Sequence, residues 1–249
     1  MRDVPAVAVC ATCGDPSCPG HDFEMSGERP INRTFAWEDG QTPPMRAMWR
    51  TAMASASDLE LWVRASLSQD AGVGPPATFA LSCELVAVIT SCLPLAAIAA
   101  TLAWVGTHDV RAVFTVFAVA ARVGAVFIPA MIVIHVVYQA VLARAGGRRG
   151  KPIARVAAIR AGLYSCGWDL ATGPAGILAS LLSGEWREAR SRAGGNNTLF
   201  RQATRTWLSR VHGVEGELAE QARRATWPWM VVLLLLTVVL VGWTFVASL

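Results

Sequence analysis

Four cysteine and histidine side chains near the N-terminus have the types and the spacing of a metal site. Cys10, Cys13, Cys18 and His21 form the pattern C-x2-C-x4-C-x2-H. Structural zinc sites use four thiolate or imidazole ligands arranged as a tetrahedron. Because protein side chains would fill all four coordination positions, no position would remain for water or a substrate. A zinc ion here would therefore be structural and would organise a small head. The alternative, on these residues alone, is a group of reduced thiols without a metal.

Four ionisable side chains interrupt the apolar segments of the chain: Glu84, Arg122, His135 and Asp169. A charged group inside a bilayer is costly, so such residues are functional hypotheses by default. Counted along helices that rise about 1.5 Å per residue, Glu84 and His135 lie at similar depths, and Arg122 and Asp169 both lie toward the outer half. The sequence therefore predicts the pairs Glu84–His135 and Arg122–Asp169. They act either as structural links between helices, which we favour, or as a proton or ion path.

Three apolar segments are long enough to place these residues inside a membrane. Residues 77–105 contain one charged residue, residues 112–143 contain one, and residues 227–249 contain none. A bilayer core requires about 20 apolar residues in a helix, so each segment predicts a transmembrane helix. A fourth segment, residues 156–183, is weaker because it contains two charged residues and a Gly-Pro pair. It predicts either one kinked span, which we favour, or a re-entrant hairpin.

The composition agrees with a membrane protein. Of the 249 residues, 53% are hydrophobic and 16% are charged, whereas a soluble domain carries about 25% charged residues. The formal net charge of +4 is too small to indicate a nucleic-acid-binding protein. One lysine accompanies 21 arginines, and this bias, together with abundant alanine and valine, indicates a bacterial genome rich in G and C. We therefore expect an integral protein of the bacterial inner membrane.

The basic residues predict the orientation in the membrane. The loop after the second span contains five basic residues and no acid, which places this loop and the N-terminus in the cytoplasm. Residues 184–226 contain eight arginines against five glutamates and also have a cytoplasmic composition. A single crossing by residues 156–183 would put them on the opposite side, so the charge rule opposes the kinked span, and the sequence leaves this point open.

Two further segments have helical apolar periodicity, residues 43–70 and 197–225. Such helices either lie in the headgroup plane or pack on the ends of a helical bundle, and the sequence favours neither. The predicted organisation is therefore a cytoplasmic head over residues 1–34, a linker with an amphipathic helix over residues 35–76, and a transmembrane domain over residues 77–249.

Motifs of enzymes are missing from the sequence. It contains no G-x-S-x-G, no G-x-x-x-x-G-K-[ST] and no H-E-x-x-H. The four histidines lie far apart in the predicted topology. We therefore expect a protein that is not an enzyme.

The layout resembles the bacterial branch of the Yip (Ypt-interacting protein) membrane family. The resemblance covers residues 35–249 and rests on Ala36-Trp37-Glu38, on a helix with Arg46, Trp49 and Thr51, and on the stretch from Gly72 to Leu81 that opens the first span. The head is similar to small zinc-ribbon or half B-box modules. The resemblance implies five spans, a cytoplasmic N-terminus and no catalytic activity; eukaryotic relatives bind Rab-type GTPases. This sequence departs from the family in having three strong spans and one weak segment, and no site residue transfers.

The sequence thus predicts an all-α, multi-pass transmembrane bundle with amphipathic interfacial helices and a zinc-binding head. The expected function is a non-enzymatic scaffold or adaptor that recruits a partner protein to the lipid bilayer, and that is able to form a homo-oligomer. The alternative is a small transporter or channel subunit that uses Glu84, Arg122 and Asp169.

Overall fold

The structure is a computed structural model, and it describes residues 35–67, 72–182 and 197–248. The zinc head predicted over residues 1–34, with Cys10, Cys13, Cys18 and His21, lies outside the described residues, so this site stays a prediction. The described part of the chain is helical throughout and contains no strand.

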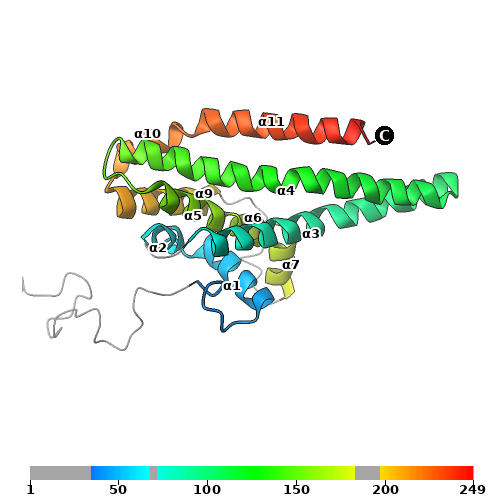
Figure 1. Ribbon diagram of the computed structural model, residues 1–249, viewed down its shortest axis with the longest axis horizontal. Coiled ribbons are helices and arrows are strands. Elements are labelled where there is room, and N and C mark those ends of the chain that lie inside the picture. Colours follow the sequence, from blue (N-terminus) through cyan, green and yellow to red (C-terminus); the bar gives the residue numbers. More distant parts are fainter. Residues whose placement is uncertain (1–34, 68–71, 183–196, 249) are drawn as a thin grey trace, which may run out of the picture. The chain divides into compact units, whose positions relative to one another are not determined.

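A long antiparallel hairpin of two helices is the main feature of this part of the chain (Figure 1). Helix α3 runs over Gly74–Thr107 and helix α4 over Val110–Gly147. The connection is short because His108 adopts a left-handed conformation with φ 52° and Asp109 caps α4, accepting a hydrogen bond from the Arg111 amide at 2.8 Å. At a rise of 1.5 Å per residue, the helices measure about 51 and 57 Å, longer than the bilayer core of about 30 Å.

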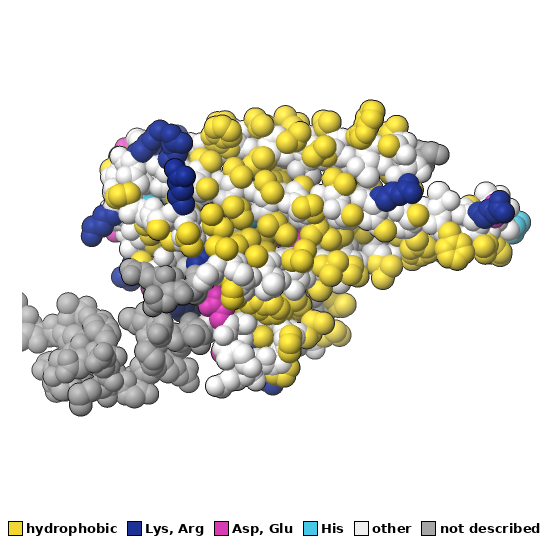
Figure 2. Space-filling view, viewed as in Figure 1, with side chains coloured by type: hydrophobic (Ala, Val, Ile, Leu, Met, Phe, Trp, Pro, Cys, Tyr) yellow, Lys and Arg dark blue, Asp and Glu magenta, His cyan; other side chains and the backbone are white. Residues whose placement is uncertain are grey.

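Helix α11 (Trp227–Val246) packs along α4 (Figure 1). The segments Gly74–Thr107, Val110–Gly147 and Gly216–Val246 are long and apolar enough to cross a membrane. Their side chains are mostly exposed apolar groups, and Figure 2 shows this hydrophobic surface over α4 and α11. Exposed apolar surface of this extent requires lipid around it. The three strong predicted spans are therefore confirmed as membrane-spanning candidates, and the chain is an integral membrane protein.

The segment predicted over residues 156–183 as a kinked span or a re-entrant hairpin is not a single helix, and it is not among the membrane-spanning candidates of the described residues. This segment forms three short helices, α5 (Arg155–Ser165), α6 (Gly167–Thr172) and α7 (Pro174–Leu182). The second break lies at Gly173-Pro174, because Pro174 has no amide hydrogen to continue α6. None of the three helices is long enough to cross a bilayer by itself. The basic residues that follow are therefore not forced to the side opposite the preceding loop.

Short amphipathic helices cover one end of the hairpin. Helices α1 (Pro44–Ser57) and α2 (Leu61–Leu67) replace the helix expected over residues 43–70. Helix α9 (Asn197–Trp207), the π-helix η2 (Leu208–His212) and helix α10 (Gly216–Arg224) replace the one expected over residues 197–225. We call α1, α2, α5, α6, α9, η2 and α10 the cap. Of the two arrangements that the sequence left open, the structure has these helices packed on the end of the bundle.

The core of the cap is aromatic. Trp62 and Trp207 are fully buried, and the Trp207 indole donates a hydrogen bond to Ser66 Oγ at 2.8 Å. Phe35 stacks on Tyr164 with ring centroids 4.0 Å apart, and Tyr164 also contacts Phe79 of α3. The linker before α1 is held as well, because the Trp37 indole donates to the Pro75 carbonyl at 2.8 Å. Apolar burial thus attaches the cap to the start of the first span.

Candidate functional site

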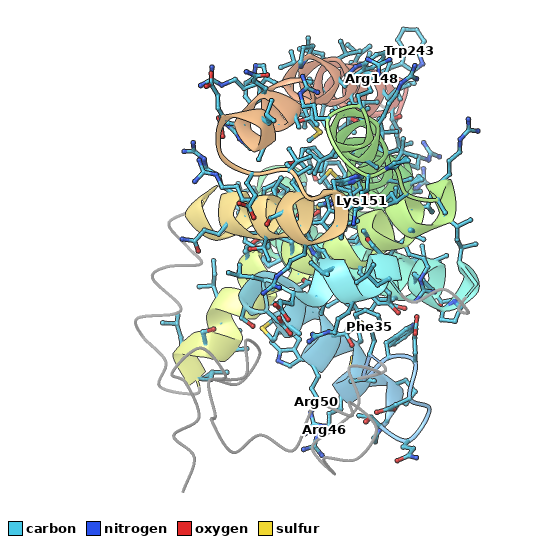
Figure 3. The ribbon with its side chains drawn as sticks, turned by 90° about the vertical axis from the view of Figure 1, so that its left-hand side faces the viewer. Phe35, Arg46, Arg50, Arg148, Lys151 and Trp243 are labelled. Atoms are coloured by element: carbon cyan, nitrogen blue, oxygen red, sulfur yellow. The ribbon has the colours of Figure 1, made fainter. Side chains whose placement is uncertain are left out.

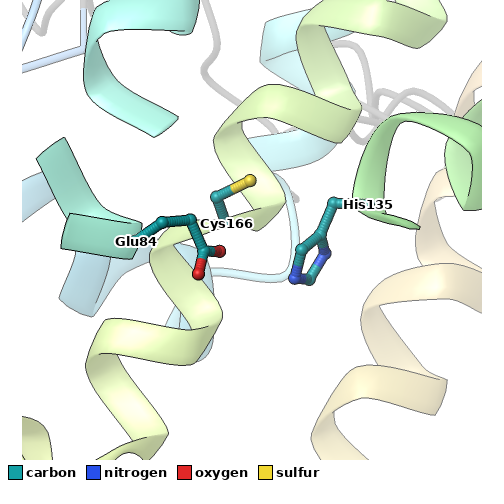
Figure 4. A group of neighbouring side chains, drawn as sticks. All are labelled: Glu84, His135 and Cys166. Carbon is teal, nitrogen blue, oxygen red and sulfur yellow. The ribbon is translucent and has the colours of Figure 1, made fainter. Parts of the chain in front are cut away.

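Five polar side chains meet where α3, α4 and the α5–α6 junction pack together. Glu84 belongs to α3, His135 to α4, Ser165 and Cys166 to the end of α5, and Asp169 to α6. We call these five residues the polar cluster. Four are almost fully buried, with exposed fractions of 1% for Glu84, 9% for His135 and 0% for both Ser165 and Cys166. Figure 4 shows the side chains of Glu84, His135 and Cys166 entering the same space from different helices.

Two glycines allow the helices to meet so closely. A Cβ atom on Gly162 of α5 would lie 2.7 Å from the Val136 Cα of α4. A Cβ atom on Gly167 would lie 2.9 Å from the Ala52 Cα of α1. Both distances are shorter than a carbon contact allows, so any other residue would push α5 away from α4 or α6 away from α1.

Hydrogen bonds connect His135 of α4 to α5 and to α6. His135 Nε2 lies 2.8 Å from Asp169 Oδ2, and His135 Nδ1 lies 3.0 Å from Ser165 Oγ. Ser165 Oγ donates its own hydrogen to the Gly162 carbonyl at 2.7 Å. Because a hydroxyl has one hydrogen, Ser165 accepts from His135, and Nδ1 carries a proton. Nε2 is therefore the atom of His135 that faces the carboxylates.

Glu84 is the member of the cluster with the poorest hydrogen bonding. Its Oε1 atom is buried and has no hydrogen-bond partner. One ligand atom each from Glu84, His135 and Cys166 lies within 4.8 Å of the others. The side chain of Asp169 is 25% exposed, so the cluster reaches the surface of the protein through Asp169.

The electrostatics of the short-helix residues follow from burial and from their neighbours. Burial opposes ionisation of Asp169, but the charge and the hydrogen bond of His135 hold the pKa of this carboxyl below its ordinary value. Burial, followed by the negative charges of Glu84 and Asp169, raises the pKa of the Cys166 thiol well above its ordinary value. Without a cation in the cluster, Cys166 is therefore a neutral thiol.

One predicted pair forms and the other does not. Glu84 and His135 come together, as expected from their similar depth. The pair Arg122–Asp169 is wrong, because Asp169 bonds to His135 and Arg122 is exposed on α4. Arg122 precedes His135 by 13 residues, or about 20 Å along the helix. The depth count failed because it treated residues 156–183 as a single span.

A second buried charge, not singled out from the sequence as a site, lies on α5. Arg160 of α5 is 1% exposed. It donates hydrogen bonds to the carbonyls of Ala65 at 3.3 Å and Gly72 at 2.6 Å, and it pairs with Glu38 at 3.0 Å. The Tyr164 hydroxyl also donates to Glu38. Burial, followed by this hydrogen bond and the charge of Glu38, raises the pKa of Tyr164. The signal in the sequence was a lone arginine in an apolar segment.

The outer surface of the cap end is strongly basic. Glu220 of α10 makes ion pairs with four arginines, at 3.2 Å for Arg201, 3.6 Å for Arg205, 2.6 Å for Arg223 and 3.4 Å for Arg224. Figure 2 shows Lys and Arg side chains gathered at this end. On α1, Arg46 and Arg50 are exposed and point away from the bundle (Figure 3).

Comparison with protein-family models, with curated proteins and with solved structures finds no match to this chain. The resemblance to the Yip family therefore stays a prediction.

Proposed function

We propose that this protein is a non-enzymatic membrane scaffold whose cap is held rigidly on its spans. The observation that carries this proposal is the set of contacts made by the buried ionisable side chains. Glu84 and His135 of the long hairpin face the α5–α6 junction, and Arg160 of α5 bonds to the segments around α2 and to Glu38. The contacts of His135 thus link the hairpin to the cap, and those of Arg160 hold the cap and the linker together. A transport path requires them to line a route along the spans, and the exposed Arg122 lies about 20 Å from His135 along α4.

The basic surface supports a docking role for the cap. Four arginines surround the single carboxylate of Glu220, which leaves an excess of positive charge. Arg46 and Arg50 add charge on α1. Such a surface attracts anionic lipid headgroups and acidic protein surfaces. We propose that the protein lies in a bacterial inner membrane with its N-terminus in the cytoplasm, as the Yip resemblance implies. In this proposal the head binds zinc through Cys10, Cys13, Cys18 and His21 and recruits a protein partner.

Cross-linking of the full-length protein in native membranes tests this proposal. We expect a partner protein that cross-links to the wild type and is lost in the Cys13→Ser/Cys18→Ser variant. The control variant, Arg111→Gln, lies at the far turn of the hairpin and retains the partner. The same preparations are reconstituted into vesicles that contain a pH-sensitive dye. Proton flux that requires Glu84, without a partner lost in the head variant, would overturn the scaffold proposal in favour of a transporter.

A further inference from the structure

Two side chains of the polar cluster, Glu84 and Cys166, have atoms that make no hydrogen bond or only a long one. Oε1 of Glu84 has no partner although it is buried. The contact of the Cys166 thiol with the Gly162 carbonyl is long, at 3.8 Å. A buried oxygen without a partner costs about 1–3 kcal/mol. These residues therefore present unsatisfied electron donors toward one another.

The types of these donors point to one class of ligand. A thiolate, an imidazole and a carboxylate are the three kinds of side-chain ligand that zinc accepts, at about 2.3 Å for sulfur and about 2.0–2.2 Å for nitrogen and oxygen. At these lengths, tetrahedral ligand atoms lie about 3.3–3.8 Å apart. The atoms of Glu84, His135 and Cys166 all lie within 4.8 Å of one another. The three ligand atoms therefore need to approach one another by no more than about 1.5 Å to reach tetrahedral spacing.

The hydrogen bonds of His135 orient the ring for this role. Ser165 accepts from Nδ1, which leaves Nε2 facing Asp169 Oδ2 at 2.8 Å. A ligating histidine commonly donates its other ring N–H to a fixed oxygen, which sets the tautomer and the orientation of the ring. Ser165 provides this oxygen, because its own hydrogen is donated to Gly162. The Asp169 carboxylate lies against Nε2, so it is the candidate for a fourth ligand beside Glu84, His135 and Cys166.

We propose that Glu84, His135, Cys166 and Asp169 bind a zinc ion that joins α3, α4 and the α5–α6 junction. The ion supplies the positive charge that two carboxylates and a thiolate require in a buried site. Because the protein provides all four ligands, the site is structural. It is distinct from the head site and does not depend on the scaffold proposal.

Metal content of the full-length protein in detergent tests the site. The background variant is Cys10→Ser/Cys13→Ser/Cys18→Ser/His21→Asn, which removes the head ligands so that only the cluster is measured. We expect about one zinc per chain, lost on adding Cys166→Ser or Glu84→Gln and retained on adding Cys92→Ser. Cys92 is a matched control because it lies on α3 outside the cluster. No zinc in the background variant, or zinc that survives both cluster substitutions, would overturn the proposal.

Two readouts keep the test decisive if a cluster variant fails to fold. Cobalt replaces zinc in the background variant, and we expect thiolate-to-cobalt charge-transfer absorption that persists in Cys92→Ser. In the same protein, a chelator lowers the unfolding temperature and added zinc restores it. A monodisperse background protein without this absorption, and with an unfolding temperature that neither chelator nor zinc changes, would show that the cluster binds no metal.

Discussion

The buried guanidinium of Arg160 holds three segments of the chain together. It donates to the Ala65 carbonyl in α2, to the Gly72 carbonyl before α3, and to Glu38 in the linker. Replacing Arg160 with Ala leaves Glu38 and these carbonyls without their partner. Removing one member of a buried ion pair costs about 3–5 kcal/mol. We expect a loss of this size in the free energy of unfolding, measured in detergent.

Arg111→Ala is the control for this substitution. Arg111 is exposed at the turn of the hairpin, and surface substitutions usually change stability by no more than about 0.5 kcal/mol. Equal stability of the Arg160→Ala and Arg111→Ala proteins would contradict the role given to Arg160.

His212 gives the cap a dependence on pH. Its Nδ1 atom donates to the Lys151 carbonyl at 2.6 Å, and its Nε2 atom is buried without a partner. Burial lowers the pKa of His212 below its ordinary value. The unfolded chain therefore binds a proton more readily than the folded chain. The contribution of neutral His212 to the free energy of unfolding is fully present above about pH 6.5. It is lost as the pH falls through the lower pKa of His212 in the folded protein.

We expect the unfolding temperature to fall between about pH 7 and pH 5, and less so in His212→Asn. The asparagine amide can replace the Nδ1 donor but does not titrate. The same pH dependence in both proteins would exclude His212 as its source.

The sequence predicted the meeting of Glu84 and His135 but not their partners. Both residues lie on helices that are continuous, so counting the helical rise gave their depth correctly. Asp169 and Arg160 lie on short helices whose positions depend on tertiary packing. No count along the chain could place them beside His135 and Glu38.

Helices α4 and α5 approach each other at a glycine. A Cβ atom on Gly162 would lie 2.7 Å from the Val136 Cα and 3.1 Å from the His135 carbonyl oxygen. Gly162→Ala must therefore separate the two helices and disturb the polar cluster. Overpacking of this kind costs about 1–3 kcal/mol. We expect this loss in the free energy of unfolding in detergent.

Gly106→Ala is the matched control for Gly162→Ala. Gly106 also lies in a helix, but an added Cβ atom would have no neighbour within 4 Å. Alanine there should leave stability unchanged or raise it slightly by restricting the unfolded chain. A Gly162→Ala protein as stable as the Gly106→Ala protein would exclude close packing at this crossing.

The two breaks in residues 156–183 show what local sequence could predict about the elements. Gly173-Pro174 was visible as a break, because proline cannot continue the preceding helix. The break at Cys166–Gly167 had no such signal. Gly167 is required there by its contact with Ala52 of α1, which is 115 residues earlier in the chain. The amphipathic segments were predicted correctly as helical, and packing decided where they end.

Helix α11 must insert into lipid if the chain spans a membrane as the structure indicates. Leu235 is exposed near the middle of α11. An arginine at the centre of a span costs about 2.5–3.5 kcal/mol on the insertion scale. We expect Leu235→Arg to reduce the fraction of α11 that integrates, measured by the protease protection of a C-terminal tag in native membranes.

Met45→Arg is the control for Leu235→Arg, because Met45 is also exposed but belongs to α1 of the cap. It should leave integration unchanged. Equal integration of the two proteins would mean that α11 does not cross the bilayer.

For the molecule as a whole, hydrophobic length was sufficient to predict the three spans. Residues 77–105, 112–143 and 227–249 fall within or close to α3, α4 and α11, since about 20 apolar residues have few alternatives to a membrane helix. The attachment of the cap was not predictable, because it depends on contacts between segments far apart in the sequence.

The central claim is that the polar cluster attaches the cap to the spans, and a double-mutant cycle tests it most directly. The free energy of unfolding is measured for the wild type, His135→Ala, Asp169→Ala and the double variant. Residues in contact couple by about 0.5–3 kcal/mol. We expect coupling in this range, because His135 of α4 and Asp169 of α6 stabilise each other. Effects that simply add, from proteins that are all folded, would contradict the account.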